Sequence, residues 1–167
     1  MQIHIAAGVG SAPTKLAAFD TALVNAGIAN YNLIKLSSVI PEHTQIVVHK
    51  GKIRKNPGKW GDRLYTVMAE ERADTPNVEA WAGIGWVQTK TGAGLFVEHE
   101  GASKTAVEQD IRDSLEALMK NRKMNPADFK IHMKIAGITR KRNPVCALVV
   151  AVYQASDWEN TAFLNQA

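Results

Sequence analysis

The feature that most constrains the fold is a nearly unbroken apolar run at residues 145–155, close to the end of the chain. A continuous run of Val, Ala and Leu is typical of a strand that is buried on both faces. Such a strand needs a packed layer on each side, because neither face can be left in water. The run therefore predicts a central strand inside a layered protein.

The pattern of the remaining chain supplies those layers. Apolar spacing predicts two amphipathic helices, at about 15–26 and 104–122, and alternation predicts six or seven strands. We therefore predict an α+β protein with an αββα sandwich, in which two β-sheets pack face to face and a helix covers each outer face. A length of 167 residues fits a single domain, 1–167, with residues 156–167 as a tail.

Composition narrows the class of protein. The chain is 46% hydrophobic and 22% charged, as in ordinary soluble globular proteins. No apolar run approaches the roughly 20 residues needed to cross a bilayer, and the first residues enter a strand pattern without a signal-peptide core. A lone Cys146 excludes an intrachain disulfide. We therefore expect a cytoplasmic protein without a membrane partner.

The first helix contains an acidic residue at an unusual place. Leu16, Phe19 and Leu23 share one side and are expected to form the buried stripe. Asp20 lies within or beside that stripe. It is either an edge residue in contact with water, or a carboxylate kept to meet a cationic group of a ligand, because a buried charge needs a partner. The pattern leaves both interpretations open.

The segment 32–41 contains two serines where apolar residues would be expected. It predicts a short buried strand that runs into Ser37 and Ser38 and stops at Pro41. Serine is a poor strand former, and a buried hydroxyl without a partner costs roughly 1–3 kcal/mol. The two hydroxyls therefore require either compensating partners or a chemical role.

The strand expected at 94–100 places a carboxyl group beside the core. Alternation puts Phe96 and Glu98 on the same face. If Phe96 is buried, Glu98 also points inward, where burial favours the neutral form of a carboxyl group and suits it to donate a proton. The alternative is a glutamate at the end of a sheet, in contact with water.

Ordinary site motifs are missing from the sequence. The histidines lack metal-ligand spacing, and there is no phosphate loop, dinucleotide fingerprint or Gly-x-Ser-x-Gly motif. Residues 50–63, here called the basic loop, are rich in Lys and Arg, which in some proteins attract nucleic acid or an anionic surface. Trp60 alone does not make a stacking platform, so a solvated loop is favoured and no nucleic-acid partner is expected.

Three segments in order resemble the pyruvoyl-dependent arginine decarboxylase family. Segment 32–41 is similar to the family's processing site, 18–28 to its first helix, and 94–101 to the strand with its catalytic glutamate. Their order and spacing match, and the resemblance covers about residues 3–153. The departures are His99, where an aromatic such as tyrosine is expected, the basic loop, and a longer C-terminal tail.

The resemblance implies a zymogen that cuts itself. The bond between Ser37 and Ser38 would break, giving a β chain of residues 1–37 and an α chain of residues 38–167. Ser38 would attack the Ser37 carbonyl, the resulting ester would undergo β-elimination, and hydrolysis would leave a covalent pyruvoyl group in place of Ser38, without any metal. Only a residue with a β-oxygen can both attack and leave, so Ser38 would be essential whereas Ser37 would be replaceable.

The resemblance also implies a carboxy-lyase that converts L-arginine to agmatine and CO2 in polyamine biosynthesis. The pyruvoyl group would be the electron sink, Glu98 the proton donor and Asn32 an assisting polar residue. Asp20 would bind the guanidinium group of arginine. Family members assemble as trimers or hexamers with active sites between subunits. Two alternatives stay open: the same fold and processing with another amino acid as substrate, or a non-enzymatic basic binding module.

Overall fold

The computed structural model describes residues 1–54 and 58–159. Its elements in chain order are β1 (Gln2–Ser11), α1 (Lys15–Ala26), β2 (Asn32–Lys35), β3 (Val39–Ile40), β4 (Gln45–Val48), β5 (Arg63–Ala73), β6 (Glu79–Gln88), β7 (Gly94–Gly101), α2 (Lys104–Asn121), the 3-10 turn η1 (Pro126–Asp128), β8 (His132–Thr139) and β9 (Val145–Ser156).

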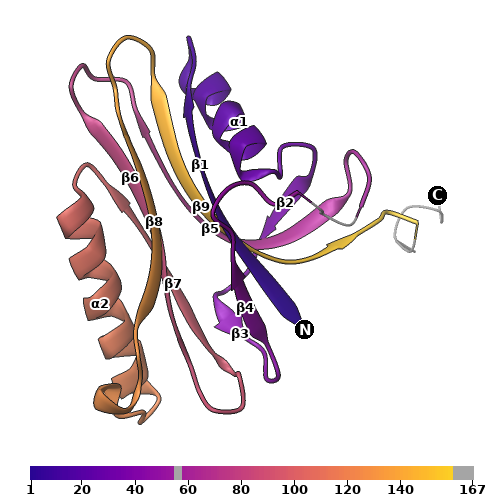
Figure 1. Cartoon of the computed structure of the whole chain (residues 1–167), viewed down its shortest axis with the longest axis vertical. Helices are drawn as coiled ribbons and strands as arrows, with labels where there is room; N and C mark the ends of the chain where they lie inside the picture. Colours follow the sequence, from indigo (N-terminus) through magenta and orange to yellow (C-terminus); the bar gives the residue numbers. More distant parts are fainter. Residues whose placement is uncertain (55–57, 160–167) are drawn as a thin grey trace, which may run out of the picture.

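The strands form two sheets that pack against each other (Figure 1). The five-stranded sheet has the order β2-β5-β9-β1-β4, and the four-stranded sheet has the order β3-β7-β6-β8. Helix α1 packs on β1 and β9, outside the first sheet, and α2 packs on β6 and β7, outside the second. The predicted α+β class, with its αββα arrangement, is therefore confirmed.

The apolar run occupies the expected central position. Strand β9 lies between β5 and β1, and most of its length is buried. Its side chains alternate between two cores. Ala147 and Val149 belong to the core between the sheets, whereas Leu148 and Val150 belong to the core beneath α1. Because both faces are covered, the strand is apolar over nearly its whole length.

The single buried strand predicted at 32–41 is wrong. The segment forms two short strands, β2 and β3, at the edges of different sheets, and neither is fully buried. Strand β2 pairs in parallel with β5, and β3 pairs antiparallel with β7. Between them, Ser38 has a φ of 64°, which an extended strand does not accommodate. This division contributes to the nine strands of the described residues, where six or seven were predicted.

The buried face of α1 also differs from the prediction. Leu16 is 69% exposed, and small residues, Ala18, Ala22 and Ala26, are fully buried instead. The cause is a close approach of helix and strand: a Cβ atom added at Gly10 of β1 would lie 2.0 Å from the carbonyl oxygen of Ala18. At this separation only small side chains fit between the two backbones, so the leucine is turned outward.

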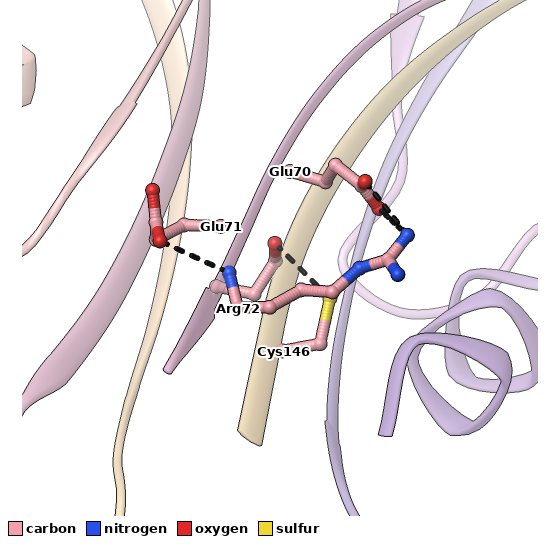
Figure 2. Close-up of polar contacts among 5 residues, drawn as sticks. Glu70, Glu71, Arg72 and Cys146 are labelled. Atoms are coloured by element: carbon pink, nitrogen blue, oxygen red, sulfur yellow. Dashed lines mark hydrogen bonds and ion pairs between the residues drawn. The ribbon is translucent and has the colours of Figure 1, made fainter. Parts of the chain in front are cut away.

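The rest of the predicted stripe lies at the rim of the same interface. Leu23 is buried and Phe19 is partly buried there. The guanidinium carbon of Arg72, on β5, lies 4.1 Å from the centre of the Phe19 ring. The Arg72 guanidinium group pairs with the Glu70 carboxylate at 2.8 Å. Figure 2 shows this pair on one side of β5 and Glu71 on the other. The Arg72 guanidinium group therefore covers the Phe19 ring at the edge of the core beneath α1.

Helix α2 follows its predicted pattern closely. The Ser103 side chain accepts a hydrogen bond from the Ala106 N–H and caps the N-terminus. The residues that face the four-stranded sheet are spaced as the helical period requires. They are Val107, Ile111, Leu115 and Met119.

The last strand extends one residue into the segment 156–167, which was predicted to be a tail. Strand β9 extends to Ser156, residues 157–159 follow it, and residues 160–167 lie outside the described part of the chain. Residues 55–57 of the basic loop also lie outside it. Within the described residues, no helix combines the length and hydrophobicity that a membrane span needs.

Candidate active site

Ser37 and Ser38 lie where the chain crosses from one sheet to the other. Before them, the Leu36 N–H donates to the Thr66 carbonyl of β5 at 2.9 Å. After them, the Ser38 carbonyl accepts a hydrogen bond from the Phe96 N–H of β7 at 2.8 Å. The peptide bond between the two serines is therefore held from both sides, by different sheets.

Ser38 combines a strained backbone with a partnered hydroxyl group. Its φ of 64° lies in the left-handed region, which costs a non-glycine residue roughly 1–2 kcal/mol. Its hydroxyl donates a short hydrogen bond to Oε1 of Glu98. Backbone strain of this kind persists only where the surroundings impose it, and it concentrates at functional sites. Ser38 therefore combines a strained backbone with a hydroxyl held against a carboxyl group, which makes it the stronger candidate of the two serines.

Glu98 reaches Ser38 because alternation along β7 points it between the sheets. Phe96, on the same face, is 1% exposed and belongs to the core between the sheets. Glu98 itself is partly buried. Its charge acts on Tyr153 across the sandwich: burial, and then Glu98, raise the pKa of the Tyr153 hydroxyl well above its ordinary value. The Glu98 carboxyl group thus lies beside the Ser38 hydroxyl and next to an apolar core.

A pocket of about 330 Å³ opens beside this pair. Besides Ser38 and Glu98, its walls come from β7 and α2, and they are formed by Phe96, Val97, His99, Ser114, Ala117 and Leu118. Larger pockets, of about 420 and 480 Å³, border the basic loop. We choose the smaller pocket as the candidate site because it contains the Ser38 hydroxyl bonded to Glu98. A hydroxyl held against a proton acceptor is the arrangement that nucleophilic catalysis needs.

His99 occupies the other face of β7. Its Nε2 lies 2.8 Å from Oγ of Ser114, on α2. The histidine that stands where the family resemblance suggests a tyrosine therefore joins strand to helix at the pocket wall.

Two further candidate residues lie away from Ser38 within one chain. Asn32 opens β2, and its side-chain amide donates to the Gly61 carbonyl at 2.5 Å. Asp20 is exposed on α1, which lies outside the five-stranded sheet, whereas the pocket is formed by the other sheet and α2. The structure brings Ser38 and Glu98 together, and it does not bring Asp20 or Asn32 to them.

Other nucleophiles and metal sites are less suitable. Burial raises the pKa of the Cys146 thiol to about 12, which makes it a poor nucleophile, and its sulfur faces the Ala147 carbonyl (Figure 2). In residues 1–54 and 58–159, no group of three or more His, Cys, Asp or Glu side chains could hold a metal ion.

Sequence reasoning missed Tyr153. Its hydroxyl donates to the carbonyl of Val39, the residue directly after Ser38, at 2.9 Å. A signal was present, since a tyrosine near the end of an otherwise apolar strand needs a partner for its hydroxyl. The sequence could not show that this partner is a backbone carbonyl of β3.

Comparison with known proteins gives a consistent result. The family model for pyruvoyl-dependent arginine decarboxylase matches residues 2–158. A pyruvoyl-dependent arginine decarboxylase of Thermococcus kodakarensis is 37% identical over 89% of this chain and 91% of its own. Proteins of the same name from Pyrococcus horikoshii, 37% identical over 83% and 85%, and Halobacterium salinarum, 38% identical over 67% and 66%, are also similar.

Proposed function

Since the chain belongs to the pyruvoyl-dependent arginine decarboxylase family, we propose that it cuts itself between Ser37 and Ser38 and then acts as a carboxy-lyase that converts L-arginine to agmatine and CO2. The observation that carries this proposal is the Ser38 hydroxyl, which donates to Glu98 at the crossover between the sheets. This contact gives the nucleophile of self-cleavage a proton acceptor.

Self-cleavage needs only groups of this chain and one water. Oγ of Ser38 gives its proton to Glu98 and attacks the Ser37 carbonyl. The C–N bond between the serines breaks, an ester forms, and the proton passes to the freed Ser38 nitrogen. β-Elimination then moves the Ser38 Cα proton to the departing carboxyl group of Ser37, breaks the Cβ–Oγ bond and leaves Ser37 with a new C-terminal carboxyl group. The dehydroalanine that remains takes up water and releases ammonia, which leaves a pyruvoyl group at the start of residues 38–167.

The surroundings of Ser38 fit such a group. The group keeps the carbonyl of residue 38, which the Phe96 N–H already holds at 2.8 Å, and the pocket beside it has room for a substrate. Once formed, it would supply an electrophilic carbonyl for the substrate amine and an electron sink for the loss of CO2. Glu98 then returns a proton to the substrate carbon, from the same position in which it accepted one.

The far end of the substrate needs a carboxylate. Within one chain, Asp20 lies on the wrong side of the five-stranded sheet to supply it, but it is exposed. We therefore assign the guanidinium group to Asp20 of the partner subunit, which requires active sites between the subunits of a trimer or hexamer. Asn32, on the edge strand β2, would assist at the same boundary. A cytoplasmic location suits a chain whose cysteine is free and buried.

The purified protein is expected to be cut. Under denaturing conditions, mass spectrometry should find two pieces, residues 1–37 and 38–167, with the second lacking a free amino group. The same sample should release CO2 from L-arginine. An intact 18.2 kDa chain that never splits would exclude a pyruvoyl enzyme. Salt-dependent nucleic-acid binding by such an uncut chain would favour the basic binding module instead.

Replacing Asp20 by asparagine is expected to lower kcat/KM for arginine by about a hundredfold or more, because a guanidinium group would lose its charged partner. Self-cleavage should continue, because it involves Ser37, Ser38 and Glu98 but no substrate, whereas Asp20 of the partner subunit is assigned to the far end of the substrate. The matched control is Asp110→Asn, on the exposed side of α2. Steady-state kinetics measure both variants, with neutral amino acids as competing substrates. Unchanged arginine kinetics in Asp20→Asn would contradict the assignment and favour a different substrate.

A further inference from the structure

The hydrogen bond from Tyr153 to Val39 joins the two sheets next to the cleavage point. Tyr153 belongs to β9, in the five-stranded sheet, whereas Val39 begins β3, at the edge of the four-stranded sheet. The donor and acceptor oxygens are 2.9 Å apart. The Tyr153 and Phe96 rings also meet in a T-shaped arrangement, with ring centres 6.2 Å apart. The tyrosine is therefore fixed at both its ring and its hydroxyl group.

Strand β3 depends on this bond more than a longer strand would. It contains only Val39 and Ile40, and among the described strands it pairs with β7 alone. Ile40 is buried in the core between the sheets, but Val39 is 54% exposed, so at the residue next to Ser38 the side chain contributes little packing. A short edge strand of this kind is weakly held by its own ladder. The Tyr153 hydroxyl supplies an attachment from the opposite sheet.

The same bond completes a set of anchors around the reactive peptide. Leu36, before the serines, is bonded to Thr66 of the five-stranded sheet. The Ser38 carbonyl is bonded to the Phe96 N–H of the four-stranded sheet. Tyr153 holds the next carbonyl along the chain, and the strained φ of Ser38 lies between these fixed points. The strain can persist because the chain is held on both sides of it.

We propose that Tyr153 is a positioning residue for self-cleavage, whose hydroxyl fixes the Val39 carbonyl and thereby aims the Ser38 hydroxyl between the Ser37 carbonyl and Glu98. This inference rests on the proposed function, because it concerns the same cleavage. The tyrosine donates one hydrogen bond and transfers no proton. After cleavage it would hold the second residue of the new chain 38–167, and so fix the position of the group formed from Ser38.

The electrostatics agree with a donor that stays protonated. Burial and the nearby Glu98 both raise the pKa of the Tyr153 hydroxyl. The phenol is therefore neutral throughout the physiological range and remains able to donate to Val39. Because Tyr153 stays neutral and bonded to Val39, it does not take the proton of Ser38. Tyr153 positions the chain, and Glu98 accepts the proton.

The test is Tyr153→Phe, which removes one oxygen and keeps the ring against Phe96. The rate of appearance of the pieces 1–37 and 38–167, followed by mass spectrometry after expression and purification in the cold, should fall by about five- to tenfold, as expected for one lost positioning hydrogen bond. The curve of cleavage rate against pH should keep the same shape as in the wild type. The matched control is Tyr65→Phe, because Tyr65 is also partly buried on a strand of the same sheet; it should be cut at the wild-type rate.

A second measurement separates positioning from general loss of structure. In an uncleavable Ser38→Ala background, Tyr153→Phe should unfold at nearly the same temperature as Ser38→Ala alone. Slow cleavage with an unchanged unfolding temperature supports the proposal. Cleavage at the wild-type rate overturns it, and so does slow cleavage explained by a large fall in unfolding temperature. If the wild-type chain itself is never cut, the proposed function fails first, and the two failures are thus distinguishable.

Discussion

A Ser38→Ala variant is expected to remain one uncut chain and to release no CO2 from arginine. Alanine has no β-oxygen, so it can neither attack the Ser37 carbonyl nor leave in β-elimination. The fold should persist, because Ser38 lies at the crossover between the sheets and outside the three hydrophobic cores. Mass spectrometry under denaturing conditions and an assay of CO2 release measure the two losses.

Ser37→Ala is the matched comparison for this variant. It removes the neighbouring hydroxyl group, which is exposed, and leaves the backbone carbonyl that self-cleavage uses. We expect this variant to be cut. Cleavage of Ser38→Ala at the normal bond, or failure of Ser37→Ala to be cut in a folded protein, would contradict the different roles assigned to the two serines.

The layered fold could be predicted because the buried faces of a strand or helix determine where apolar residues occur in its sequence. Strand β9 is apolar on both faces since it lies inside the five-stranded sheet with cores on either side. Helix α2 packs a regular stripe of large residues on the other sheet. In both elements the number of covered faces determines the period of the apolar residues, so class and layers follow from the pattern.

The errors arose where the tertiary neighbour decides the outcome. Leu16 has the spacing of a buried residue, but α1 lies so close to Gly10 that alanines occupy its buried face. The segment 32–41 has the composition of one strand, but Ser38 turns out of it and the chain continues in the other sheet. Local composition contains neither the distance between elements nor the sheet to which a strand belongs.

Individual residues of the candidate site could be predicted from the sequence, but their contacts could not. Alternation along β7 was enough to place Glu98 on the face of Phe96, and the serine pair was conspicuous by its composition. Neither feature shows that residues separated by 60 positions meet, as Ser38 and Glu98 do. Asp20 is the opposite case: no contact among the described residues of one chain explains it, and its assigned role requires a second copy.

Glu98→Gln is expected to slow self-cleavage by about a hundredfold or more, within the range that general acid–base groups contribute. Glutamine has nearly the same shape, and its amide oxygen can still accept the Ser38 hydrogen bond now made to Glu98, so the local structure should be kept. It cannot take up the proton, however. The fraction that is eventually cut should also decarboxylate arginine slowly, because the same group returns a proton to the product.

Glu100→Gln provides the control, since Glu100 lies on the same face of the same strand but is exposed. It should be cut and should turn over arginine as the wild type does. Time courses of cleavage, and single-turnover rates corrected for the cut fraction, separate the two steps for each variant. If Glu98→Gln is cut normally but decarboxylates slowly, Glu98 acts only as the later proton donor, and the Ser38 hydroxyl loses its proton to another acceptor. Normal rates in both steps would remove Glu98 from the mechanism altogether.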